Sequence, residues 1–218
     1  MTKKIIVVAV HPDDETLGCG GTLLKHKAQG DEIFWLICTT QTSPLTEKER
    51  QENLASVALH YAFDAVHHLN LVTTTVDTYS MSTLVSAISA IFSQVQPDTV
   101  YLPFKSDVHS DHRKIFEAAY SCTKSFRYPS IKKVLMMETL SETEFAPATK
   151  EDCFIPNVFI DISAYFDKKC AILGLYQQEL GLHPFPRSIR NVTALATLRG
   201  ATSGCDYAES FMLLKEIA

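Results

Sequence analysis

The sequence predicts an α/β protein, a Rossmann-like and mostly parallel sheet with helices on both faces. Short apolar runs rich in Val and Ile recur along the chain, and longer amphipathic stretches separate them. This alternation is typical of β-α-β units around a parallel sheet. The chain has 218 residues, 46% of them hydrophobic, which is enough to bury a sizeable core. Because we find no internal repeat or low-complexity tract, we expect one domain over residues 1–218.

The individual elements follow from the same runs. Apolar segments predict strands at residues 3–10, 32–39, 65–71, 99–104, 132–138 and 156–162. The intervening and later stretches predict helices at 17–29, 46–61, 81–95, 111–123, 165–179 and 206–217. Within one of these, Leu84, Ile88 and Ile91 share a helical face, as expected of a helix that covers a sheet. Residues 140–156 and 181–191 are interrupted by proline, and we expect them to be loops.

Composition excludes several classes of function. The net charge of −5 argues against nucleic acid as the partner, because phosphate binding needs a basic face. No window approaches the ~18 uninterrupted apolar residues of a membrane helix, so we expect no transmembrane segment and a cytoplasmic location. The six cysteines are scattered and never form a C-x-x-C pair, which predicts reduced thiols. Composition leaves a homo-oligomer open.

The segment "AVHPDDETLGCGG", residues 9–21, follows the first predicted strand directly. In an open parallel sheet, ligands bind beyond the carboxyl ends of the strands, so His11, Asp13, Asp14 and Glu15 are expected at that crevice. Neighbouring carboxylates repel one another, and the start of a helix offers only about half a positive charge to offset them. A divalent cation would balance them better, and the segment therefore predicts a metal site.

Imidazole and carboxylate together are typical zinc ligands, and catalytic zinc sites commonly have three protein ligands. Pro12 fixes a turn that lets His11 and Asp14 point to one place, so the third ligand must come from elsewhere. The segment "SDVHSDHRK" follows the fourth apolar strand and offers His109, Asp111 and His112. Two segments distant in sequence are thus predicted to meet at one sheet edge. Fe²⁺ and Co²⁺ also accept such ligands, so the set does not choose the metal.

Other interpretations of these residues account for less of the pattern. The "HPD" of J-domain co-chaperones lies in a polar loop between helices, whereas here it follows a strand. The glycines of "GCGG" lack the G-x-G-x-x-G spacing of dinucleotide binding. Helix capping would explain one acid but not the histidine and both aspartates. We expect Cys19, His67 and His68 to be structural.

The opening motif and "HSDH" together resemble the PIG-L/LmbE family of zinc-dependent deacetylases, which remove acetyl groups from N-acetylglucosamine-containing substrates. "ERQENLASVAL", "METLSETEF", "FIPNVFIDIS" and "LATLRGATSGCDYAESF" resemble later family segments in the right order, so that the resemblance covers nearly the whole chain. Two positions depart from the family pattern. Leu59-His60 replaces a leucine-glycine pair, and Asp107 stands where some members carry tyrosine. The residue that stabilises the oxyanion is therefore not assigned.

The resemblance implies a role for each residue of the site. The metal ligands would be His11, Asp14 and His112. Asp13 would be the general base, and His109 the general acid, held protonated by Asp111. Zinc would activate a water molecule against the acetamide.

Substrate recognition is expected to come from the loops around the crevice. The substrate-binding candidates are Arg50, Asn157 and Arg187, of which Arg50 matches a family arginine that holds sugar hydroxyls. Arg199 and Glu209 also match family positions and would contact substrate or form internal ion pairs. Two alternatives stay open: an amidase that cleaves a thiol-sugar conjugate or antibiotic precursor, and a non-catalytic sugar-binding module.

Overall fold

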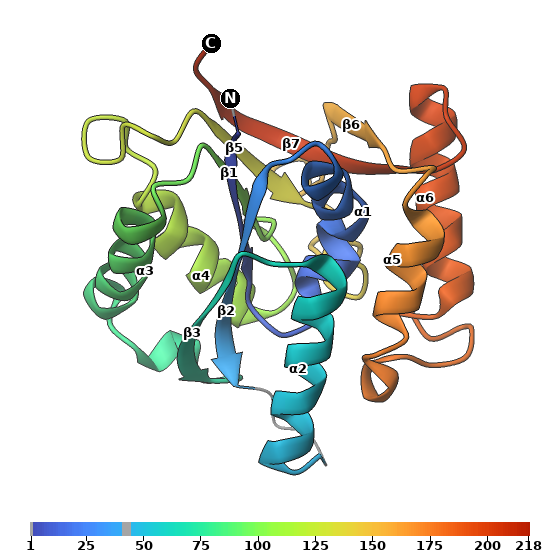
Figure 1. Ribbon diagram of the computed structural model, residues 1–218, viewed down its shortest axis with the longest axis horizontal. Helices are drawn as coiled ribbons and strands as arrows, with labels where there is room; N and C mark the ends of the chain where they lie inside the picture. Colours follow the sequence, from blue (N-terminus) through green and yellow to red (C-terminus); the bar gives the residue numbers. More distant parts are fainter. Residues whose placement is uncertain (1, 41–44) are drawn as a thin grey trace.

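The computed structural model describes residues 2–40 and 45–218, and within them seven strands form one sheet (Figure 1). The strands are β1 (Lys4–Ala9), β2 (Glu32–Thr40), β3 (Ala65–Val72), β4 (Thr99–Leu102), β5 (Lys133–Met137), β6 (Val158–Asp161) and β7 (Ala208–Glu216). Their order is β3-β2-β1-β4-β5-β7-β6. The pairs among β1 to β5 are parallel, and β7 runs antiparallel to β5 and β6. The predicted Rossmann-like, mostly parallel sheet is confirmed.

Helices cover both faces of this sheet, as predicted (Figure 1). The α-helices are α1 (Asp14–Ala28), α2 (Glu47–Tyr61), α3 (Met81–Val95), α4 (Ser110–Ser121), α5 (Phe166–Leu173) and α6 (Ile189–Ser203), and the 3₁₀ turns are η1 (Val76–Thr78) and η2 (Gln177–Glu179). Alternate residues of β1 enter two separate cores. Ile5 and Val7 pack in the core that α1, α2, α5 and α6 cover, whereas Ile6 and Val8 pack in the core under α3 and α4.

The end of the chain differs from the sequence prediction. The predicted helix 206–217 is wrong, because this segment forms β7 in the interior of the sheet. Phe211 packs in one core and Leu214 packs against the other. The apolar residues of this segment are therefore buried on both faces of a strand and do not form one stripe of a helix. The predicted helix 165–179 ends at Leu173.

Helix α6 was not predicted, and it begins inside the expected loop 181–191. Ser188 caps it by accepting a hydrogen bond from the amide of Asn191. Its buried residues are Val192, Ala196 and Gly200, a stripe so narrow and so poor in large apolar side chains that periodicity does not reveal it. The expected loop 140–156 contains no helix or strand.

The glycines at the end of the segment 9–21 allow close packing around α1. A Cβ on Gly20 would lie 2.5 Å from the Tyr61 hydroxyl, and one on Gly21 would lie 2.7 Å from Ile162. The helix is interrupted at Cys19, and the amides of Gly21 and Thr22 donate to the Glu209 carboxylate at 2.9 and 2.7 Å. These residues therefore position α1 against its neighbours.

A buried ion pair joins α5 to β7 beneath α1. Lys169 Nζ lies 2.7 Å from Glu209 Oε1, and both side chains are almost fully buried, at 4% and 5% exposure. Lys169 also donates to the carbonyl of Leu17 at 3.0 Å. This contact, like the pair between Arg199 and Glu138, is internal, which favours the ion-pair interpretation of the family positions Arg199 and Glu209.

None of the described helices has the length and apolar character needed to span a bilayer. All six cysteines are free thiols.

Replacing Lys169 by methionine tests how much the buried ion pair between Lys169 and Glu209 contributes to stability. The variant leaves the Glu209 carboxylate buried without its cation, and we expect the free energy of unfolding to fall by about 3–5 kcal/mol in urea titrations. Lys133→Met is the matched control, because Lys133 pairs with Glu216 at the surface and should cost less than about 1 kcal/mol. Equal losses in the two variants would contradict the assignment.

Candidate metal and catalytic site

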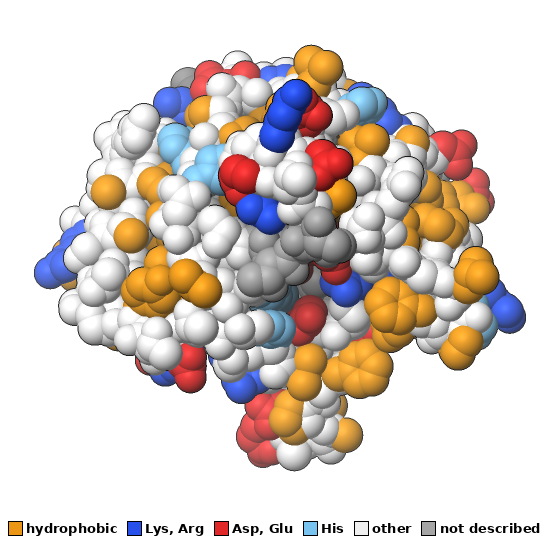
Figure 2. All heavy atoms as spheres, turned by 90° about the horizontal axis from the view of Figure 1, so that it is seen from below, with side chains coloured by type: hydrophobic (Ala, Val, Ile, Leu, Met, Phe, Trp, Pro, Cys, Tyr) orange, Lys and Arg blue, Asp and Glu red, His pale blue; other side chains and the backbone are white. Residues whose placement is uncertain are grey.

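The two motifs meet because the strands that precede them are neighbours. β1 and β4 pair in parallel, so their carboxyl ends lie at the same sheet edge. Beyond β1 the chain enters α1 on one face, and beyond β4 it enters α4 on the other, which opens a crevice where the connections diverge. Figure 2 looks onto this edge and shows histidine, acidic and basic side chains gathered in a hollow.

Three side chains converge in this crevice at distances suited to a metal. His112 Nε2 lies 3.2 Å from His11 Nδ1 and 3.3 Å from Asp14 Oδ2, and the last two atoms are 4.0 Å apart. A tetrahedral zinc ion with bonds of about 2.0–2.1 Å holds its ligands about 3.3 Å from one another. The structure thus brings together the three residues predicted as ligands, and their donor atoms fit one divalent cation.

Backbone geometry separates the two adjacent aspartates. Asp13 has a φ of 119°, a conformation that L-residues adopt rarely and at a cost of about 1–3 kcal/mol. Asp14 Oδ2 accepts the amide of His11 at 2.9 Å and faces His112. Asp13 Oδ2 instead accepts a hydrogen bond from Arg187 Nη1 at 3.2 Å. The two carboxylates therefore serve different partners.

A buried carboxylate that the sequence analysis did not assign orients His112. Asp107 Oδ2 lies 2.9 Å from His112 Nδ1, both side chains are fully buried, and Asp107 Oδ1 accepts the hydroxyl of Thr143 at 2.7 Å. Such a partner fixes the ring so that its other nitrogen faces the metal. Burial would lower the pKa of His112, but Asp14 and Asp107 outweigh it and raise the pKa to about 10.

The surroundings of Asp111 differ from the expectation that its carboxylate holds His109. Asp111 Oδ2 lies 3.5 Å from His11 Nε2 and 3.9 Å from His109 Nδ1. Its two oxygens accept the amides of Thr74 and Val76. His109 caps α4, and its Nδ1 accepts the backbone amide of Asp111 at 3.1 Å. In neutral His109 the proton therefore lies on Nε2, while Asp111 faces mainly His11.

Asp13 lies in a cavity of about 230 Å³ beside the three convergent side chains. The cavity is lined by His11, Asp13, Thr73, Thr74, His109, Glu142, Glu179 and Arg187. Burial raises the pKa of Asp13 well above its ordinary value, Asp14 adds to this, and Arg187 opposes it. Raising the pKa toward the working pH improves a carboxylate as a general base.

The buried Glu15 carboxylate holds the backbone of Asp13 in place. Its Oε2 accepts the amide of Asp13 at 3.1 Å, and its Oε1 accepts the hydroxyls of Thr16 and Tyr176. Burial raises the pKa of Glu15 to about 7, against the lowering effect of these donors. The network holds the strained Asp13 backbone in place.

The other predicted residues lie in different places. Arg187 reaches the cavity. Arg50 lines an adjoining cavity of about 60 Å³ with Pro12 and donates to the carbonyl of Leu45 at 3.0 Å. Asn157 is a correction, because its side-chain oxygen accepts the amide of Leu213 at the β6–β7 pair. β6 is an edge strand, and β5 and β7 lie between it and β4, so the hydrogen bond of Asn157 supports the β6–β7 pair.

Sequence reasoning also missed Glu142, which lines the cavity. Its Oε2 accepts the amide of His109 at 3.2 Å, and burial raises its pKa. Glu142 lies in the segment 140–156, which has no hydrophobic periodicity. The only signal in the sequence is its acidic side chain, close to other polar residues that were considered for the site.

Comparisons with known proteins show what this chain is similar to. The sequence profile of the PIG-L family, described as "GlcNAc-PI de-N-acetylase", matches residues 6–123. The uncharacterized deacetylase YaiS of Escherichia coli K12 is 28% identical over 78% of this chain and 89% of its own. The diacetylchitobiose deacetylase of Thermococcus kodakarensis is 22% identical over 99% of this chain and 84% of its own.

Solved structures share the fold. The conserved protein TT1542 of Thermus thermophilus superposes with a TM-score of 0.83 at 23% identity, covering 100% of this chain and 97% of its own. GalB, the 4-carboxy-2-hydroxymuconate hydratase of Pseudomonas putida KT2440, superposes with a TM-score of 0.75 at 17% identity, covering 100% and 98%. The fold thus accommodates more than one reaction, and the site decides the chemistry.

Asp107→Asn tests whether this carboxylate orients His112. Losing the charged partner should weaken Zn²⁺ binding by about 10–100-fold, measured by titration calorimetry against a competing chelator. Asp152→Asn is the control, because Asp152 bonds to the adjacent Ser106 at the surface and should leave the affinity unchanged. Wild-type affinity in Asp107→Asn would show that the contact does not serve the metal.

Proposed function

The chain belongs to the PIG-L family, and from this premise we propose that it is a metal-dependent hydrolase that removes the N-acetyl group from an N-acetylglucosamine-type sugar or sugar conjugate. The observation that carries the proposal is the convergence of His11, Asp14 and His112 at metal-ligand spacing beside the separate carboxylate of Asp13. The family profile and the diacetylchitobiose deacetylase of T. kodakarensis support a sugar acetamide as the substrate.

Zinc is the metal that we propose, since two imidazoles and one carboxylate suit its tetrahedral preference. Fe²⁺ and other divalent transition metals also accept this set. When bound, the metal would supply a Lewis acid for the acetyl carbonyl and lower the pKa of water toward about 7. Asp107 and Asp111 would orient His112 and His11 as its ligands.

Asp13 is the residue that we propose takes a proton from the attacking water. Its carboxylate is buried in the cavity and bonded to Arg187, and it is not one of the three convergent donors. Arg187 would hold the carboxylate in one orientation and also contact the sugar, whereas Arg50 in the adjoining cavity would contact more remote hydroxyls.

His109 is the residue that we propose supplies a proton to the departing sugar nitrogen. To act as the acid, His109 would carry a proton on both ring nitrogens, so that its Nδ1, which accepts the amide of Asp111 in the neutral ring, would instead face the Asp111 carboxylate 3.9 Å away. Its Nε2 would then give a proton to the sugar nitrogen and leave a neutral ring. Before the next turnover Asp13 would lose the proton that it accepted and His109 would regain the one that it gave up, so that each cycle consumes one water and yields acetate, the free amine and one proton. We also propose a cytoplasmic location, which the six free thiols favour.

Acetate release tests the proposed function directly. Purified protein loaded with Zn²⁺ should release acetate from N-acetylglucosamine or its conjugates, lose this activity with a chelator, and regain it when Zn²⁺ is restored. A sugar-binding module would bind the same sugars without releasing acetate, and that outcome would overturn the proposal.

Substitutions of the adjacent aspartates separate their roles. Asp13→Asn should lower kcat by at least about 10²-fold while bound zinc, measured by atomic emission, stays near one equivalent per chain. Asp14→Asn should lose both the activity and most of the zinc. Near-wild-type turnover in Asp13→Asn would contradict its role as the base.

A further inference from the structure

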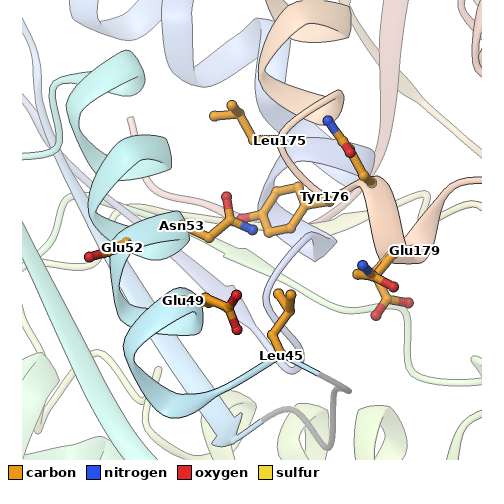
Figure 3. A pocket seen from close by; sticks show the side chains of 9 residues that line it. Leu45, Glu49, Glu52, Asn53, Leu175, Tyr176 and Glu179 are labelled. Carbon is orange, nitrogen blue, oxygen red and sulfur yellow. The ribbon is translucent and has the colours of Figure 1, made fainter.

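A further cavity, distinct from the one that Arg50 lines, adjoins the catalytic cavity. It lies between α2 and residues 175–179, has a volume of about 250 Å³, and is called the distal cavity below (Figure 3). Glu179 lines both the distal cavity and the catalytic cavity. Tyr176 lines the distal cavity, and its hydroxyl donates to Glu15, which in turn accepts the amide of Asp13. The two cavities therefore share a wall.

The lining of the distal cavity combines apolar surface with polar groups. Leu45 and Leu175 provide apolar side chains, and Figure 3 shows Asn53 extending from α2 toward the Tyr176 ring. Among the residues that the structure describes, the half-buried Asn53 amide has no hydrogen-bond partner. An amide beside an aromatic ring can bind the hydroxyls and the apolar face of a small polar ligand. The volume, close to the lower end of the ~300–1000 Å³ of small-molecule sites, fits a small group.

The charged side chains that line this cavity are acidic. Its charged lining residues in the described part of the chain are Glu49, Glu52 and Glu179, and no lysine or arginine joins them. Lys48 pairs with Glu52 and Arg187 with Glu179, whereas Glu49 accepts hydrogen bonds from the amide and hydroxyl of Thr46. Carboxylates accept hydrogen bonds from hydroxyls and repel phosphate.

We propose that the distal cavity binds the group attached to the acetamido sugar, and that it selects a neutral, hydroxylated group such as a second sugar over a phosphate. This rests on the proposed deacetylase function. Glu179 marks where the substrate passes from one cavity to the other, so that the acetamide lies near Asp13 while the attached group contacts Asn53 and Glu49.

Three substrates test this selection: N-acetylglucosamine, N,N′-diacetylchitobiose and N-acetylglucosamine 1-phosphate. With the zinc-loaded enzyme, kcat/KM from acetate release should be at least about tenfold higher for the disaccharide than for the 1-phosphate. Asn53→Ala should lower the ratio of kcat/KM for the disaccharide to that for the monosaccharide by about fivefold, mainly through KM, because one hydrogen bond is lost.

Glu49→Gln tests the charge, since glutamine also serves at this position of a helix capping box and should preserve the start of α2. It should raise kcat/KM for the 1-phosphate relative to the disaccharide by about two- to threefold at low salt. Glu117→Gln removes the same charge from the exposed side of α4, where Lys114 is its partner, and should leave all ratios unchanged.

The outcomes separate this inference from the proposed function. Unchanged ratios in Asn53→Ala and Glu49→Gln, with activity present, would overturn the distal cavity alone. If wild-type protein releases no acetate from any of the three substrates, the deacetylase proposal fails. Titration calorimetry with N,N′-diacetylchitobiose then tests whether the distal cavity binds a disaccharide. Binding that Asn53→Ala weakens would support the cavity, and no binding would overturn it too.

Discussion

The site depends on positive charge at the place where five carboxyl groups are buried together. Asp13, Asp14, Glu15, Asp107 and Asp111 are each at most 3% exposed. Burying ionised carboxylates without partners is costly, so the surrounding groups must compensate. Backbone amides, hydroxyls and Arg187 satisfy some of them. The remaining negative charge faces the space between His11, Asp14 and His112, where a divalent cation fits and would compensate it.

The topology explains why these carboxyl groups gather in one crevice. β1 and β4 are adjacent, and the connections that leave them turn to opposite faces of the sheet, so their polar ends share one crevice. The left-handed backbone at Asp13 then directs two consecutive carboxylates to different tasks, one toward the imidazoles and one toward Arg187. Asp107 fixes the direction of the His112 ring through a 2.9 Å contact, and Asp111 faces His11 at 3.5 Å.

Sequence patterns predict the parts of this molecule that repeat and the residues whose chemistry is local. The early strands and helices are continuous apolar runs or clear stripes, and both motifs follow strands directly. Helix α6 escapes such reasoning because only Val192, Ala196 and Gly200 are buried, and β7 because burial on both faces removes the alternation of a half-buried strand. Glu142 lies in a segment without hydrophobic periodicity. The partners of Asp107 cannot be predicted from the sequence, because they come from different segments that meet only in the folded chain.

The most direct measurement is a crystal structure of the zinc-loaded protein with anomalous data collected on both sides of the zinc absorption edge. The account predicts one strong peak about 2.0–2.2 Å from His11 Nδ1, Asp14 Oδ2 and His112 Nε2. His11, His109 and Asp111 form a second group at metal-ligand spacing on the other side of the same ring. A peak among those three residues, or no peak in the crevice, would contradict the assignment of ligands on which the account depends.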